Sequence, residues 1–204
     1  MLPAIRALLL LFVAIVHTEK VRNEKVIVME GSIKPGETEA LHSHPASLAV
    51  YLQGGALEVT PDGGKPQTAA PKRGDVVFRE AQRHVVKNVG STEVRSVRID
   101  FLGAPQAAPW GTVGLSPNYK LLFDNLYARV YDIRIPAGTK EPQHTHKDRV
   151  VVCLSGAQLE HILPDGRTEV STLKTGEVAW RRGGTHIGHN LGKTDLWVIA
   201  IEPK

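Results

Sequence analysis

The sequence has very little cysteine. The chain of 204 residues has one cysteine, Cys153, so no disulfide can form within it. Cys153 lies in the apolar run VVVCLSG, where a thiol most often packs as a small core residue. No neighbouring residue suggests a lowered pKa for it. We therefore expect Cys153 to be structural.

A concentrated positive charge is also absent. Lys and Arg number 25 against 21 Asp and Glu, which gives a formal net charge of +4. The basic residues are spread along the chain among acidic ones and form no continuous block, as is typical of a solvated surface. Nucleic acid is therefore not an expected partner.

Long hydrophobic runs are missing as well, apart from a short one at the N-terminus, residues 7–16. It is too short to span a bilayer, but it follows Arg6 and suits the apolar region of a secretory signal. The next residues, VHTEK, lack a small-residue cleavage pattern, so an uncleaved anchor or an apolar strand are alternatives. We expect residues 1–19 to be a signal peptide and the protein to be periplasmic or secreted, with a cytoplasmic location as the alternative.

Three familiar catalytic or nucleotide-binding patterns do not occur: a Ser–His–Asp constellation, a phosphate-binding loop and a dinucleotide fingerprint. A convincing amphipathic helix is absent too. Apolar and polar residues instead alternate in segments such as VIVMEGSI (26–33) and ARVYDIRI (128–135), which predicts strands. Pro-Asp-Gly turns lie between such runs. The pattern indicates an all-β fold of sandwiches or barrels.

The chain repeats itself after 102 positions. This offset places His42, His44 and His84 on His144, His146 and His186, and it also aligns two pairs of glycines and Asn88 with Asn190. Internal repetition predicts two similar domains. We expect barrels at residues 20–102 and 121–204. The intervening 103–120 is rich in Pro, Gly and Ala and is expected to be a linker or a strap between the barrels.

The repeated histidines have the spacing of metal ligands. Residues i and i+2 of a strand point to the same face, so His42 and His44 can converge on one ion, as can His144 and His146. A third ligand has to come from another strand. His84 and His186 are the candidates in the two halves.

Both halves resemble cupins. The family's first motif begins with Gly, five residues and His-x-His, which GETEALHSH and GTKEPQHTH match. The Gly, the His and the His-x3-Asn spacing of the second motif remain in GDVVFREAQRHVVKN and GEVAWRRGGTHIGHN, although its Pro-x-Gly centre is lost. The resemblance covers about residues 21–102 and 121–203. It implies two tandem jelly-roll β-barrels, a bicupin, similar to small uncharacterised bacterial cupins.

The sequence departs from the cupin pattern at the metal-binding Glu. Its position falls on Leu48 or Ala49 in the first half and on Val150 or Val151 in the second. We expect Ser47 and Arg149, one residue earlier, to face the other side of the strand. The sites would then hold three neutral imidazoles, which suit Zn, Fe, Ni or Cu, or they would be metal-free.

Other residues near the motifs invite simpler interpretations. We expect His189 to point away from the triad and His161 to be exposed at a turn. Asn88 and Asn190 suit structural roles. Phe78 and Trp180 are expected to be core aromatics. We expect the charges of Arg149 and Arg181 to be exposed rather than to bind a carboxylate substrate. Tyr51 and Glu58 are the nearest acid–base candidates, but the direction of their side chains is uncertain.

Three functions remain open at this point. We favour a bicupin that binds a divalent metal through three His per barrel, and a small-molecule ligand. The alternative is a three-His Fe(II) dioxygenase for an organic acid, diketone or thiol, although no acid–base residue is evident beside the triads. A metal-free structural or ligand-binding barrel is the third. We expect a monomer or homodimer.

Overall fold

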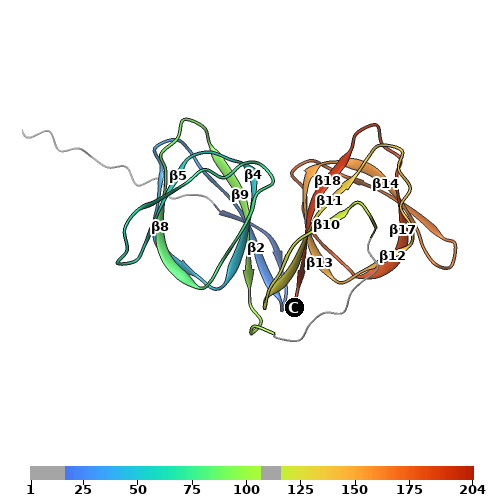
Figure 1. Cartoon of the computed structure of the whole chain (residues 1–204), viewed down its shortest axis with the longest axis horizontal. Coiled ribbons are helices and arrows are strands. Elements are labelled where there is room, and N and C mark those ends of the chain that lie inside the picture. The colour runs from blue at the N-terminus through green and yellow to red at the C-terminus, as the bar shows by residue number, and fades with distance from the viewer. Residues whose placement is uncertain (1–16, 107–115) are drawn as a thin grey trace, which may run out of the picture.

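The structure, a computed structural model, describes residues 17–106 and 116–204 and places them in two β-barrels that lie side by side (Figure 1). The described residues form strands and turns, and no helix among them could span a membrane. Within these residues, each barrel has nine strands. The predicted all-β fold of two tandem jelly-roll barrels is confirmed.

The first barrel consists of a five-stranded sheet, β1-β2-β9-β4-β7, and a four-stranded sheet, β3-β8-β5-β6. Its strands are β1 (His17–Arg22), β2 (Val26–Ile33), β3 (Thr38–His44), β4 (Ser47–Gln53), β5 (Leu57–Pro61), β6 (Gln67–Ala69), β7 (Val76–Arg79), β8 (Gln82–Asn88) and β9 (Val94–Phe101). The predicted end of the signal peptide, residue 19, thus falls within β1. Residues 1–16 lie outside the described residues, so the signal and the exported location stay predictions.

The second barrel repeats this arrangement with sheets β10-β11-β18-β13-β16 and β12-β17-β14-β15. Its strands are β10 (Tyr119–Asp124), β11 (Ala128–Ile135), β12 (His144–His146), β13 (Arg149–Ser155), β14 (Ala157–Ile162), β15 (Thr168–Leu173), β16 (Val178–Arg181), β17 (Gly184–Asn190) and β18 (Leu196–Pro203). Its first strand therefore begins inside the segment expected to be a linker. Residues 107–115 of that segment lie outside the described residues.

Alternation along the strands divides the apolar side chains between different cores. On β4, Leu48 and Val50 are fully buried between the barrels, whereas Ala49 and Tyr51 pack inside the first barrel. The two five-stranded sheets share one core, which extends from Val28 and Ile99 on one side to Val130 and Ile201 on the other. Burial on both faces explains why these strands are apolar at successive positions.

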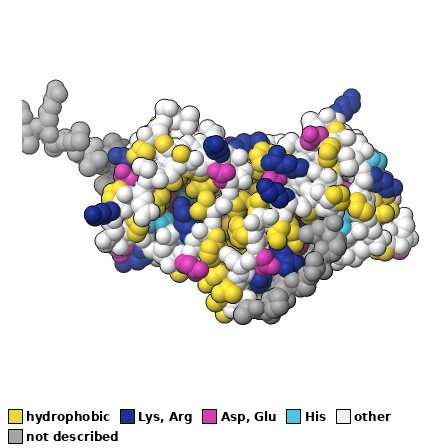
Figure 2. Space-filling view, viewed as in Figure 1, with side chains coloured by type: hydrophobic (Ala, Val, Ile, Leu, Met, Phe, Trp, Pro, Cys, Tyr) yellow, Lys and Arg dark blue, Asp and Glu magenta, His cyan; other side chains and the backbone are white. Residues whose placement is uncertain are grey.

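The seam between the barrels has further contacts of its own. Phe78, Phe101 and Tyr127 pack together at ring-centroid distances of 5.6–6.5 Å, and the Arg73 guanidinium donates a hydrogen bond to the carbonyl of Leu154. On the face shown in Figure 2, hydrophobic side chains extend across the middle of the molecule, and basic side chains are interspersed with acidic ones. The expected core role of Phe78 is confirmed, as is that of Trp180, which packs against the shared core.

A glycine turn precedes each strand that carries the paired histidines. Gly36 and Gly138 have φ angles of 79° and 73°, a left-handed conformation that side chains other than glycine rarely adopt. The backbone N–H of each donates to the carbonyl of Asn88 or Asn190, respectively. The first cupin-like motif therefore needs glycine to turn the chain into β3 and β12.

Candidate metal centres

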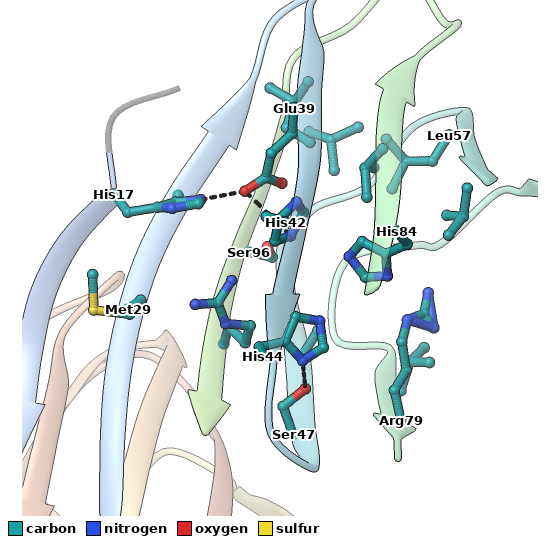
Figure 3. A pocket seen from close by; sticks show the side chains of 18 of the residues that line it. His17, Met29, Glu39, His42, His44, Ser47, Leu57, Arg79, His84 and Ser96 are labelled. Atoms are coloured by element: carbon teal, nitrogen blue, oxygen red, sulfur yellow. Dashed lines mark hydrogen bonds and ion pairs between the residues drawn. The ribbon is translucent and has the colours of Figure 1, made fainter. Parts of the chain in front are cut away.

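The predicted histidines of the first barrel come together. His42 and His44 lie on β3, and antiparallel pairing with β8 places His84 directly opposite His42. The ring centroids are 4.6–5.9 Å apart, and one ligand nitrogen from each ring lies within 4.8 Å of the others. Figure 3 shows the three rings facing one pocket.

The second barrel repeats the arrangement more tightly. His144 and His146 come from β12, and His186 pairs opposite His144 on β17. The ring centroids are 4.7–5.1 Å apart, and the Nε2 atoms of His144 and His146 are separated by 3.1 Å. Both of these rings are almost fully buried.

Hydrogen bonds to backbone carbonyls fix the tautomers of several of these imidazoles. The Nδ1 atoms of His42 and His144 lie 2.8 Å from the carbonyl oxygens two residues earlier, those of Ala40 and Pro142. His44 Nδ1 lies 2.9 Å from the Pro45 oxygen. A carbonyl can only accept, so Nδ1 carries the hydrogen and Nε2 keeps its lone pair in the neutral ring. This is the arrangement that metal-ligating histidines usually have.

Burial favours the neutral form of four of the six triad imidazoles. Desolvation lowers the pKa of His84 to about 4 and that of His186 to about 3, with the neighbouring imidazoles adding to the effect. The pKa of His146 falls to about 2, first because of burial and then because of the nearby Arg149 charge. Burial also lowers the pKa of His44. Neutral imidazole is the form that binds metal ions.

The strands that follow the paired histidines show which residue stands at the position of the metal-binding Glu of cupins. Ala49 and Val151 face the barrel interiors, whereas Leu48 and Val150 belong to the core between the barrels. No carboxylate occupies either inward position. The expectation for Ser47 was wrong, because its hydroxyl lies 3.1 Å from His44 Nδ1.

The expectation for Arg149 was wrong in the same way. Its side chain lines the interior cavity of the second barrel together with His146 and Val151. Successive side chains of a strand point to opposite faces. Because Leu48 and Val150 point into the shared core, Ser47 and Arg149 point into the barrels. Arg181 also lines this cavity but is exposed and pairs with Glu177.

A glutamate that the sequence analysis missed lies ahead of each histidine pair. Glu39 Oε1 is 3.6 Å from His42 Nε2, and Glu141 Oε2 is 3.9 Å from His144 Nε2. Glu39 and Glu141 are related by the same 102-residue offset as the triads. This repetition was the signal that would have revealed them.

The first strand of each barrel contributes one more polar side chain, and here the repeats differ. In the second barrel the Tyr119 hydroxyl lies 3.2 Å from His144 Nε2 and 3.0 Å from His146 Nε2. Its counterpart at the 102-residue offset is His17, whose Nε2 lies 3.3 Å from Glu39 Oε1 (Figure 3). Burial strongly raises the pKa of Tyr119. Sequence reasoning missed both, since Tyr119 was assigned to the linker and His17 to the signal segment.

His161 was wrongly expected to be exposed at a turn. It lies on β14, and its ring meets that of His186 edge-on at a centroid distance of 4.7 Å. His161 also lines the interior cavity, and burial lowers its pKa. His189 does point away from the triad, as predicted, and its Nδ1 lies 3.2 Å from Glu160 Oε2.

The repeated asparagines are structural, as predicted. Each is fully buried, and its side-chain amide donates to two backbone carbonyls, those of Ile33 and Thr92 for Asn88 and the equivalent pair for Asn190. Cys153 is also a core residue, with burial raising the pKa of its thiol to about 11. Of the acid–base candidates, Tyr51 lines the first pocket, whereas Glu58 is not among its lining residues.

The cavities beside the triads differ in size. That of the first barrel measures about 90 Å³ and that of the second about 400 Å³. Small-molecule sites in proteins usually have several hundred cubic ångströms. The second barrel therefore has room for a ligand beside its histidines.

No family model and no curated protein matches the chain. Several solved structures match the chain. AerE from Microcystis aeruginosa aligns with a TM-score of 0.64 at 17% identity, covering 94% of this chain and 97% of that chain. The cupin 2 conserved barrel domain protein from Leptotrichia buccalis gives 0.58 at 13% identity, with 93% and 89% covered. For the formate complex of oxalate decarboxylase from Lactobacillus farciminis the TM-score is 0.63 at 11% identity, with 89% and 78% covered. At these identities the likeness is one of fold, and the protein is a bicupin in fold, with a His triad in each barrel that could hold a metal ion.

Proposed function

We propose that this bicupin binds a divalent transition metal ion in each His triad and a small molecule beside the ion in the second barrel. The observation that carries the proposal is the convergence of three imidazoles in each barrel, with ligand nitrogens within 4.8 Å of one another. Zn, Fe, Ni and Cu all accept such a donor set. A bound ion would act as a Lewis acid on a coordinated group.

The residues fit such an ion in both barrels. His42, His44 and His84 would hold it in the first barrel. His144, His146 and His186 would hold it in the second. Carbonyl bonds at Nδ1 turn the Nε2 lone pairs of His42, His44 and His144 toward the site, and burial excludes the competing proton from His84, His146 and His186.

The second barrel is the better candidate for ligand binding. Its cavity is the larger, and Arg149 places a positive charge in the wall beside His146. Leu159, Val198 and Leu196 supply apolar wall. A cavity of this kind suits a small organic molecule that carries a polar or anionic group.

Elemental analysis of protein purified without chelator or a His-tag tests the metal proposal. We expect up to two ions per chain, one for each triad. His144→Ala with His186→Ala should remove the second-barrel ion, whereas His189→Asn, which changes a histidine outside the triads, should leave both. Trace metal only in the wild type would contradict the proposal.

A metal-dependent enzyme, such as an Fe(II) dioxygenase, is the second candidate. His161 favours it, because this imidazole touches His186 and lines the cavity, so a proton-carrying group does stand beside the second triad. Oxygen uptake by the Fe(II)-loaded protein with small organic acids, diketones and thiols tests this candidate. A rate equal to that of His144→Ala protein would exclude it for those substrates.

A further inference from the structure

Glu141 is a buried acid with neutral hydrogen-bond donors. Its side chain is 1% exposed, and its backbone N–H donates to the carbonyl of Gly188 at 2.7 Å. Carboxylate Oε1 accepts hydrogen bonds from Ser116 Oγ at 2.5 Å and Asn118 Nδ2 at 3.0 Å. Among the described residues no lysine or arginine forms an ion pair with it. With Oε1 held by these two neutral donors, Oε2 is the carboxylate oxygen that can bind a cation.

The second carboxylate oxygen faces the triad. Oε2 lies 3.9 Å from Nε2 of His144, the nitrogen that keeps a lone pair because Nδ1 is bonded to the Pro142 carbonyl. The Tyr119 hydroxyl also lies 3.2 Å from this nitrogen, and a metal ion bound here would take the place of that hydrogen bond and accept both lone pairs. With metal bonds of about 2.1 Å, neighbouring ligand atoms are about 3.0–3.4 Å apart. A small approach of the carboxylate would bring it to that spacing.

The space for this carboxylate is provided by a glycine. A Cβ at Gly188 would come within 2.7 Å of Glu141 Oε2. The equivalent position of the first barrel, at the 102-residue offset, is Val86, a residue of that barrel's core. There Glu39 shares one oxygen between His17 and His42 (Figure 3). The two barrels therefore treat the repeated glutamate differently.

We propose that Glu141 is the fourth protein ligand of the second-barrel metal and supplies, from ahead of the histidines, the carboxylate that is missing at Val151. Ser116 and Asn118 hold the oxygen that does not face the metal, and Gly188 leaves room for the one that does. The first barrel keeps three imidazoles, because its glutamate is engaged by His17. This inference rests on the proposed metal binding and specifies its donor set.

Metal affinity and the spectrum of bound Co(II) test the assignment. The full chain would carry His42→Ala and His84→Ala, so that the second site alone is observed. In that background Glu141→Gln, which keeps the shape and the acceptor for Ser116, should weaken Co(II) and Zn(II) binding about tenfold or more, as measured by competition with a chromophoric chelator. It should also shift the Co(II) visible bands, since a charged oxygen donor is lost. Gly188→Ala should shift them too, by displacing Oε2.

The matched control is Glu160→Gln, which removes a carboxylate that contacts His189 rather than the triad and should leave affinity and spectrum unchanged. Circular dichroism and the thermal midpoint establish that each variant is folded. Equal affinity and identical Co(II) bands in Glu141→Gln and its background would overturn the assignment while leaving metal binding intact. If the background itself takes up no metal but the wild type does, both the second-barrel site and this inference fail.

Discussion

At the scale of single residues, spacing was enough to find the histidines but not their partners. The His-x-His pairs and the distant third histidines could be predicted, because a strand fixes which residues share a face. Tyr119 could not, since β10 and β12 belong to different sheets and only the closure of the barrel brings its hydroxyl to the triad. His161 was misjudged for the same reason, because only the register of β14 on β17 turns it inward. Glu141 was within reach of the sequence, through its repetition at Glu39.

Acid should destabilise the metal-free protein through these imidazoles. The unfolded state takes up a proton on each histidine below about pH 6.5, whereas folded His146, with a pKa of about 2, stays neutral. The free energy of unfolding should therefore fall as the pH drops through 6.5, by about 1–2 kcal/mol for each such imidazole at pH 5. Urea unfolding of chelator-treated protein at pH 7 and pH 5 measures this. His146→Asn should lose less stability over that interval, and an identical loss would contradict the explanation.

At the scale of elements, the alternation of apolar and polar residues predicted the strands. For β4 and β13, which are buried on both faces, it could not predict which face lines the barrel. A strand that is apolar on both faces gives no sign of which face lines the barrel, so Ser47 and Arg149 were placed on the wrong side. The expected structural role of the asparagines was easier to infer. Asn190 bonds the end of β11 to the turn before β18, through the carbonyls of Ile135 and Thr194 and the N–H of Gly192.

Removal of this asparagine should weaken the barrel without touching the metal ligands. Asn190→Ala leaves three backbone groups without their partner, and we expect the free energy of unfolding to fall by about 2–4 kcal/mol. Urea unfolding at neutral pH measures the change. Gln158→Ala, at an exposed position of β14, serves as the control, and equal stability of the two variants would show that the bonds of Asn190 contribute little.

At the scale of the whole molecule, the repeat predicted two barrels but not how they meet. The repeat alone does not say which sheets of the two barrels face each other. The structure packs the five-stranded sheets face to face around one core. Each five-stranded sheet therefore buries the outer apolar face of the other.

The shared core should make the two barrels unfold together. Calorimetry should give a single transition, and Ile99→Ala, at a fully buried position of the first barrel within this core, should lower the stability of the whole chain by about 2–5 kcal/mol. Leu102→Ala, at an exposed position, should have little effect. Two separate transitions, with only one sensitive to Ile99→Ala, would show that the barrels are independent.

The shared core also has a consequence for synthesis on the ribosome. The first barrel is complete at Phe101, yet the sheet that covers Val26, Leu48 and Ile99 is complete only when β18 is made, some 100 residues later. At translation rates of about 5–20 residues per second, that delay is about 5–20 s. During this interval the nascent chain presents a broad apolar sheet face. We therefore expect a chaperone that covers this face at the tunnel exit to raise the fraction of the protein that reaches its native state.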